Sequence, residues 1–297
     1  MDFRAALMGV GFAFMWASAF ATGRMIVTAA PPMTALFARF ACSAVVAILL
    51  ALALGQNMRL SRVEWRVVIL FGISQNVLYL GLNWFAMQWV EASAAAIIAS
   101  TMPLMVAVMG WAVMKDKPRP IALAGLVAGI VGVGLIMGVR LQHGLNIPGA
   151  IMCLLGAVGL SAATLSVGRA GGSRNMMMIV GLQMVVGAVI LLIPAALLEW
   201  GRPIAWSGQV VAAFLYTVLL PSVAATWVWL LLVERIGPVR AATYHFLSPF
   251  FGVVIAAALL GERFGLSDLL GALIVAAGIL MVHLSKLPPA VEKRSAG

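Results

Sequence analysis

Ten uninterrupted apolar segments, each roughly twenty residues long, constrain this chain more than any other feature. A helix needs about 20 residues to cross the ~30 Å hydrocarbon core of a bilayer, at about 1.5 Å per residue. A transmembrane barrel would instead show shorter stretches of alternating polarity. We therefore expect an all-α integral membrane protein with about ten transmembrane helices. The segments cover residues 4–23, 34–54, 66–86, 92–113, 120–139, 148–168, 175–198, 209–232, 239–260 and 268–286.

Composition supports a membrane environment. Of the 297 residues, 64% are hydrophobic and only 9% are charged, whereas a soluble domain carries about 25% charged residues. The formal net charge of +10 is concentrated in the short loops between apolar segments. Such charge usually fixes the orientation of a membrane protein, so it does not indicate a nucleic-acid partner.

The distribution of basic residues predicts that both termini are cytoplasmic. Fourteen of the 19 Lys and Arg residues fall in the segments on the N-terminal side of the predicted membrane, and four fall on the other side. Cytoplasmic loops carry the excess of Lys and Arg. The fourteen are Arg4, Arg59, Arg62, Arg66, Lys115, Lys117, Arg119, Arg169, Arg174, Arg235, Arg240, Lys286, Lys293 and Arg294.

The two halves of the chain resemble each other. The stretch from Val90 to Leu104 aligns with the stretch from Ile236 to Phe250, and this alignment superimposes Pro103 on Pro249. Glycines in the next predicted helix of each half match at the same offset. Chance similarity between Ala- and Gly-rich helices is the alternative explanation.

If the repeat is genuine, each half holds five helices. An odd number means that the second copy enters the membrane from the opposite side, which gives the inverted repeat found in many secondary transporters. We assign residues 1–144 to the first five-helix repeat and residues 145–287 to the second, inverted one. Residues 288–297 form a polar tail, which we expect to be disordered and cytoplasmic.

The sequence resembles the EamA-type ten-helix permeases of the drug/metabolite transporter superfamily. Each half has a fourth helix with a central proline, a charged turn and a Gly-rich fifth helix. The second-half turn, Gly261-Glu262-Arg263, is close to the usual form, but Lys115-Asp116-Lys117 in the first half departs from it. Overall similarity is greatest to the YddG-like bacterial exporters of aromatic and other neutral amino acids.

This resemblance implies a central cavity lined mainly by the third, fourth, eighth and ninth helices, and transport by alternating access. It also implies location in a bacterial cytoplasmic (inner) membrane and export as the direction of transport.

Polar side chains within the third apolar segment are the first candidates for a substrate site. Asn76, Tyr79 and Asn83 are spaced by three and four residues, which places them on one helical face. Their amide and phenol groups offer donors and acceptors without charge, which suits a neutral or zwitterionic ligand. Hydrogen bonding between helices is the alternative role.

The two proline-interrupted helices are the second group of candidates. A proline removes a backbone hydrogen bond, and paired interruptions at matching positions of two halves point to a binding site near the membrane midplane. His245 could bind a carboxylate, relay a proton or be a satisfied neutral side chain. The candidate binding residues are Ser100, Thr101, Tyr244, His245 and Ser248, and the helix-breaking or hinge residues are Pro103 and Pro249.

Aromatic and charged residues complete the candidates. Trp16 in the first segment and Trp227 in the eighth are expected to line the cavity, where aromatic walls would favour apolar or aromatic substrates. Arg39 is the only clear charge inside a predicted span. If buried, it could attract a substrate carboxylate; if nearer a helix end, it would extend to the membrane surface.

Other classes of function lack their motifs. The sequence has no GxxxxGK[ST] loop of an ATP-driven pump and no HExxH or GxSxG motif of a membrane hydrolase. We expect no enzyme activity, cofactor or metal, and small molecules and lipid as partners of a monomer. The predicted function is secondary export of small metabolites, specifically aromatic or neutral amino acids. Export of other metabolites or drug-like cations, or a passive channel, is the alternative.

Overall fold

The computed structural model describes residues 3–114, 119–142, 146–167, 174–237, 241–262 and 265–284, and every regular element in these ranges is helical. The charged turn Lys115-Asp116-Lys117, Arg263 and the tail 288–297 lie outside them. The elements are α1 (Phe3–Val27), α2 (Pro32–Ala53), α3 (Arg62–Phe71), η1 (Gly72–Gly81), α4 (Leu82–Ala86), α5 (Ala92–Ala99), α6 (Met102–Met114), α7 (Pro120–Gln142), α8 (Ile147–Val167), α9 (Met176–Leu198), α10 (Gly208–Thr217), η2 (Val218–Ala224), α11 (Ala225–Ile236), η3 (Thr243–Leu247), α13 (Ser248–Leu260) and α14 (Leu266–Leu284).

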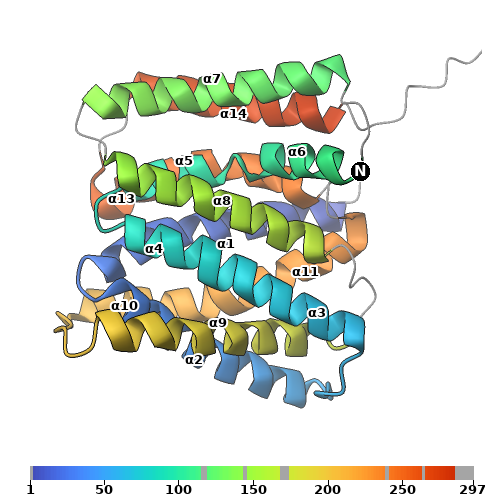
Figure 1. Cartoon of the computed structure of the whole chain (residues 1–297), viewed down its shortest axis with the longest axis vertical. Helices are drawn as coiled ribbons and strands as arrows, with labels where there is room; N and C mark the ends of the chain where they lie inside the picture. The colour runs from blue at the N-terminus through green and yellow to red at the C-terminus, as the bar shows by residue number, and fades with distance from the viewer. Residues whose placement is uncertain are drawn as a thin grey trace, which may run out of the picture.

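The helices lie side by side in a bundle with a helix pair at each edge (Figure 1). α7 packs along α14 at one edge and α2 packs along α9 at the other, with the remaining helices between them. Each edge pair joins corresponding helices of the two halves, the fifth with the tenth and the second with the seventh. The middle of the bundle is related by the same symmetry but not by pairs of corresponding helices: α1 contacts the eighth and ninth segments through α11 and α13, and its counterpart α8 contacts the third and fourth through η1, α4, α5 and α6.

The outside of the bundle is apolar. Large hydrophobic side chains such as Leu49, Ile130 and Leu155 are exposed there, as expected for a surface that contacts lipid. By length and composition, six of the described helical spans can cross a membrane, and four shorter apolar helices accompany them. The fold therefore fits the ten helices predicted from the sequence.

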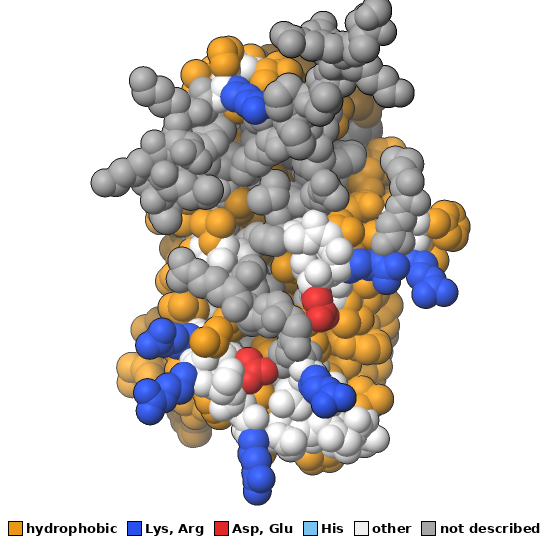
Figure 2. Space-filling model, turned by 90° about the vertical axis from the view of Figure 1, so that its right-hand side faces the viewer, with side chains coloured by type: hydrophobic (Ala, Val, Ile, Leu, Met, Phe, Trp, Pro, Cys, Tyr) orange, Lys and Arg blue, Asp and Glu red, His pale blue; other side chains and the backbone are white. Residues whose placement is uncertain are grey.

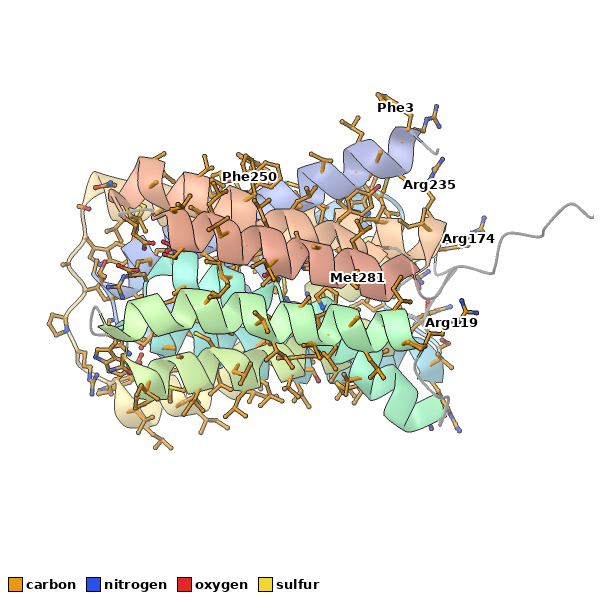
Figure 3. The ribbon with its side chains drawn as sticks, turned by 90° about the horizontal axis from the view of Figure 1, so that it is seen from above. Phe3, Arg119, Arg174, Arg235, Phe250 and Met281 are labelled. Atoms are coloured by element: carbon orange, nitrogen blue, oxygen red, sulfur yellow. The ribbon has the colours of Figure 1, made fainter. Side chains whose placement is uncertain are left out.

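Basic side chains gather at the ends of the bundle rather than on its sides. Figure 3 shows Arg119, Arg174 and Arg235 at the same end as Phe3 in the first turn of α1. The view onto this end shows several basic side chains around its rim (Figure 2). The structure thus places together residues that the sequence assigns to one side of the membrane, and the cytoplasmic identity of that side stays a prediction.

Four of the membrane-spanning segments are interrupted. The fourth breaks between α5 and α6, just before Pro103. In the ninth, the 3-10 helix η3 separates α-helical residues 241–242 from α13, which has Pro249 in its first turn. The third and eighth contain the π-helical segments η1 and η2. The sequence predicts the two proline breaks but neither π-helical segment.

Side-chain oxygens of residues in one half of the chain cap the N-termini of helices in the other half. The carboxylate of Glu199, after α9, accepts hydrogen bonds from the backbone N–H groups of Met33 (3.1 Å) and Thr34 (2.7 Å) at the start of α2. Reciprocally, Gln56 after α2 accepts from the backbone of Met178 at the start of α9 (3.0 Å). These contacts satisfy helix-terminal N–H groups that have no partner within their own helix, and they tie the two halves together.

Glu262, after α13, caps α5 in the same manner. Its carboxylate accepts from the backbone N–H groups of Ala92 (2.8 Å) and Ser93 (3.1 Å), and from the Ser93 hydroxyl. Hydrogen bonds to a charged group contribute about 1.5–3 kcal/mol each. The family-like Gly261-Glu262 turn therefore has a structural role at the start of the fourth membrane segment.

Glycines allow α7 and α14 to approach closely. A Cβ atom added to Gly132 would lie 2.8 Å from the carbonyl oxygen of Gly271, and one added to Gly278 would lie 2.5 Å from that of Gly125. Both distances are below van der Waals contact. The small residues in the fifth helix thus serve packing within the chain, as is usual for small residues in membrane helices.

Replacing Gly132 by Ala should therefore destabilise the protein by about 1–3 kcal/mol through overpacking. Gly134, two residues further along α7, has no atom within 4 Å of an added Cβ, so Gly134→Ala should be neutral or gain up to about 1 kcal/mol of helix propensity. Thermal unfolding of both detergent-purified variants at one heating rate checks this. Equal midpoints for the two variants would contradict the glycine packing.

Candidate functional site: a central cavity

A cavity lies in the middle of the bundle, between the two halves. The volume available to the centre of a water molecule is about 50 Å³, which is enough for a few water molecules. Its polar lining comes from five of the membrane segments, and half of the remaining lining residues are aromatic. The polar side chains are Arg39, Gln75, Asn76, Tyr79, Asn83, Thr164, Ser222, Thr226 and His245, and the aromatic ones include Phe12, Trp16, Phe20, Phe40, Phe71, Trp84 and Trp229.

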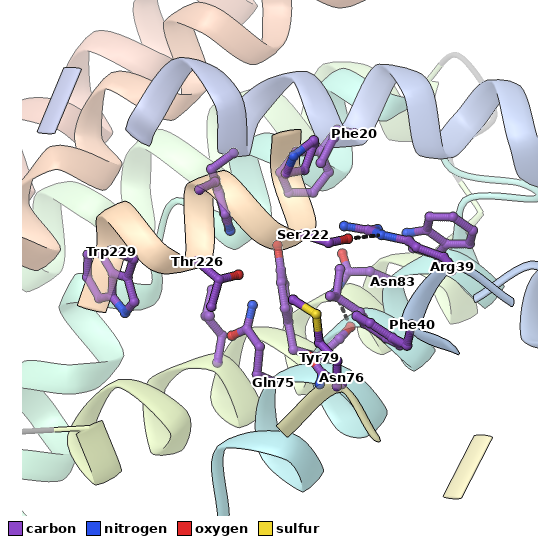
Figure 4. Close-up of a pocket in the computed structure, with 18 of the residues that line it drawn as sticks. Phe20, Arg39, Phe40, Gln75, Asn76, Tyr79, Asn83, Ser222, Thr226 and Trp229 are labelled. Atoms are coloured by element: carbon purple, nitrogen blue, oxygen red, sulfur yellow. Dashed lines mark hydrogen bonds between the residues drawn. The ribbon is translucent and has the colours of Figure 1, made fainter. Parts of the chain in front are cut away.

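The third membrane segment contributes the predicted polar face. Asn76, Tyr79 and Asn83 all line the cavity, together with Gln75, although η1 replaces the regular α-helix there (Figure 4). π-Helical turns are rare and occur frequently at functional sites. The structure therefore brings this group together as the spacing predicts.

These side chains differ in how fully their polar atoms are satisfied. The amide nitrogen of Asn76 donates to the backbone and side-chain oxygens of Gln183 in α9, so this residue also joins two helices. Asn83 donates to the Tyr79 carbonyl (2.9 Å), but its side-chain oxygen is buried without a partner, and so is that of Gln75. The two free amide oxygens are acceptors available to a ligand.

The eighth segment presents a corresponding face. Ser222, Thr226 and Trp229 line the cavity with spacings of four and three residues, whereas the predicted Trp227 is only partly buried and does not line it. The same helical spacing that identifies the third-segment residues could have found Trp229. Ser222 lies in η2, and its hydroxyl donates to the Thr217 carbonyl (2.8 Å).

Arg39 lies inside the bundle and is 2% exposed. Its Nε donates to the Ser222 hydroxyl oxygen (2.8 Å), and its Nη1 is buried without a partner. The guanidinium carbon lies 5.2 Å from the ring centre of Trp84 and 5.5 Å from that of Phe40. Of the two positions that the sequence leaves open for Arg39, the structure shows the buried one.

The His245 imidazole contacts three aromatic rings. It packs edge-on against Trp16 (centroids 4.5 Å apart), Phe12 (5.1 Å) and Trp229 (5.2 Å). Its Nδ1 is buried without a hydrogen-bond partner. Trp16 also stacks on Tyr79, with ring centroids 6.0 Å apart and planes 9° from parallel. This cluster joins the first, third, eighth and ninth segments around one aromatic wall.

Several candidates from the sequence lie outside the cavity wall. The hydroxyls of Ser100 and Thr101 donate to the carbonyls of Ile97 and Ile98 (2.6 and 2.7 Å), where α5 ends. The remaining three are Tyr244, whose ring lies against Gly9; Ser248, which is buried with an unpartnered hydroxyl; and Trp227. Pro103 and Pro249 are buried beside the helix breaks, and their hinge role stays a prediction.

A second hollow lies between helix ends opposite the N-terminus. Its volume available to the centre of a water molecule is larger, about 510 Å³. Its lining residues include Arg24, Glu91 and Glu262. Its carboxylate Glu262 is engaged in capping α5. The central cavity is the better candidate because it lies in the middle of the bundle and four of its lining side chains have a buried polar atom without a partner, whereas in the second hollow only Arg24 does. Within the described residues, no three His, Cys, Asp or Glu side chains cluster as metal ligands would.

A membrane-embedded helical bundle of two similar halves around a partly polar cavity defines a polytopic transporter. The chain belongs to the EamA-like transporter family, whose model matches residues 3–138 and again residues 147–284. The double match covers almost the whole chain, and it confirms the resemblance that the sequence shows to the drug/metabolite transporter superfamily.

Individual relatives agree with the family but name no substrate. The uncharacterized transporter YvbV of Bacillus subtilis is 22% identical over 280 residues, covering 94% of this chain and 92% of its own. Protein PecM of Dickeya dadantii is 23% identical over 235 residues, covering 78% of each chain. One crystal structure shares the fold, with a TM-score of 0.71 and 20% identity over 95% of this chain and 96% of that one.

The position of the cavity can be tested by cysteine labelling. After Cys42→Ser and Cys153→Ser, Thr226→Cys should react with a small charged thiol reagent when the helices move apart, because residue 226 lines the cavity. The neighbouring Trp227→Cys should react at least ten times more slowly, since residue 227 does not line the cavity. Mass spectrometry of the labelled protein gives both rates. Faster labelling at 227 would place the cavity wall on the wrong face of the eighth segment.

Proposed function

We propose that this protein is a secondary transporter that exports small metabolites, specifically aromatic or neutral amino acids, by alternating access. The observation that carries the proposal is the central cavity, where free hydrogen-bonding groups and aromatic rings meet in the middle of a membrane bundle. We further propose that it acts as a monomer in a bacterial inner membrane.

The lining chemistry supports a ligand with a polar end and an apolar or aromatic side chain. Neutral amides can hold a polar group without binding it so tightly that release becomes slow. The rings of Trp16, Trp229 and Phe12 offer faces and edges that aromatic side chains pack against. The cavity is too narrow for such a ligand as it stands, so the helices must move apart to admit it.

Movement of this kind is supported by the helix interruptions. Transporters of several folds place broken helices at corresponding positions of two repeats, beside the substrate. Here the breaks before Pro103 and Pro249 occupy such positions, and η1 and η2 do so in the third and eighth segments. A passive channel is the second candidate, but large buried side chains such as Trp84 and Tyr79 in the cavity wall favour a carrier.

Reconstitution into liposomes tests the function. Flux of labelled neutral and aromatic amino acids should saturate with concentration and show counterflow, which a pore cannot produce. Comparison of flux with and without a pH gradient shows whether protons drive it. Linear, non-saturable flux would favour the channel, and no flux of any amino acid by folded protein would contradict the substrate assignment.

Substitutions in the cavity should reduce transport without unfolding the protein. Trp16→Ala removes the ring that joins Tyr79 and His245, and we expect at least a tenfold loss of flux. His245→Ala should have a similar effect. Trp227→Ala is the matched control, because the same side chain is removed from a position outside the cavity, and its flux should stay within about twofold of the parent.

A further inference from the structure

Arg39 brings a buried positive charge to the cavity wall. It is the eighth residue of α2, about 10 Å from the start of the helix. One guanidinium nitrogen is satisfied by Ser222, and another is buried without a partner. No carboxylate from the described residues forms an ion pair with it, and none lines the cavity.

Such an arrangement is costly for a purely structural residue. Insertion of an arginine near the middle of a membrane helix is unfavourable. Cation–π contacts with the rings of Phe40 and Trp84 offset part of this cost. A single hydrogen bond to a hydroxyl leaves the positive charge without a counter-charge, so the site is complementary to an anion.

Figure 4 shows which side chains lie at each side of the cavity. Arg39 lies with Ser222 and Asn83 at one side, while Thr226, Gln75 and Trp229 lie toward the other. The free amide oxygens of Asn83 and Gln75 can accept hydrogen bonds from an ammonium group. A ligand with a carboxylate at Arg39 could therefore direct its side chain toward the aromatic wall.

We propose that Arg39 binds the carboxylate of the transported solute, so that the cavity accepts small carboxylates, zwitterionic amino acids included, and rejects solutes with a net positive charge. This inference rests on the proposed transport function and narrows its substrate class. Guanidinium groups match carboxylates with paired, charge-assisted hydrogen bonds. The inference disfavours drug-like cations as substrates, because the described cavity wall offers them no negative charge.

A purely structural role for Arg39 makes a different prediction. If Arg39 only joins α2 to η2 through Ser222, its loss should lower thermal stability and reduce flux of all solutes alike. Recognition instead predicts a loss that depends on whether the solute has a carboxylate. Ser222→Ala separates the two roles further, because it removes the helix–helix hydrogen bond and keeps the positive charge.

The test compares amino acids with derivatives that lack one charge. Phenylalanine and alanine are each paired with their amides, and 3-phenylpropionate and phenethylamine are added as compounds without the ammonium or the carboxylate. Each compound is measured by thermal stabilisation of the detergent-purified protein and by counterflow in liposomes. The variants are Arg39→Gln, Arg39→Lys and Ser222→Ala, with Arg24→Gln as the control arginine outside the cavity.

We expect the parent protein to bind at least one of the carboxylates ten times or more tightly than the matching amide or amine. Arg39→Gln should abolish this preference, Arg39→Lys and Ser222→Ala, which keep the positive charge, should retain part of it, and Arg24→Gln should retain it in full. If no carboxylate is preferred over its amide, or if Arg39→Gln keeps the full preference, the inference is overturned.

The two readouts separate this inference from the transport proposal. Carboxylate-dependent stabilisation that Arg39→Gln removes, without counterflow of any compound, would support the binding site and contradict the carrier. Saturable counterflow of amino acids that ignores the carboxylate would support the carrier and overturn the role of Arg39. Because the parent protein alone reports the carboxylate preference, a variant that fails to fold does not decide the outcome.

Discussion

The need to satisfy every backbone hydrogen bond in hydrocarbon governs this structure. A departure from α-helical geometry at membrane depth is tolerated where its backbone is buried in protein, lines a cavity or is re-bonded in 3-10 or π turns. Here π-helical, 3-10 and broken segments occur in the third, fourth, eighth and ninth membrane segments. Three of these irregular segments carry polar cavity residues: η1 holds Asn76 and Tyr79, η2 holds Ser222, and η3 holds His245.

Part of this organisation is predictable from sequence because apolar length and polar spacing are local signals. Ten segments and the polar face of Asn76, Tyr79 and Asn83 follow directly from them. In the eighth segment the same spacing indicates Ser222, Thr226 and Trp229, but aromatic character alone favours Trp227 equally, and the structure leaves Trp227 outside the wall. Ser100 and Thr101 were likewise ambiguous, since hydroxyls can bond to their own helix.

Electrostatics distinguishes the two regions where charges are buried. At the helix ends, Glu199 and Glu262 are held by backbone N–H groups, so their charges are compensated by the fold itself. In the cavity, the Arg39 guanidinium donates one hydrogen bond to a hydroxyl and lies near two aromatic rings. The buried Glu199 and the half-buried Glu262 are thus stabilised by the fold, whereas the buried Arg39 keeps unused hydrogen-bonding capacity. This is the asymmetry expected between a scaffold and a binding site.

The tryptophans in the cavity wall give the protein a built-in optical probe. Indole emission depends on its surroundings, and Trp84 lies beside the Arg39 guanidinium while Trp229 lies beside His245. Filling the cavity would therefore change the intrinsic fluorescence. Four other tryptophans are exposed outside the cavity and could be replaced by Phe to lower the background, so that occupancy is read in real time without an added label. These four are Trp65, Trp89, Trp200 and Trp206.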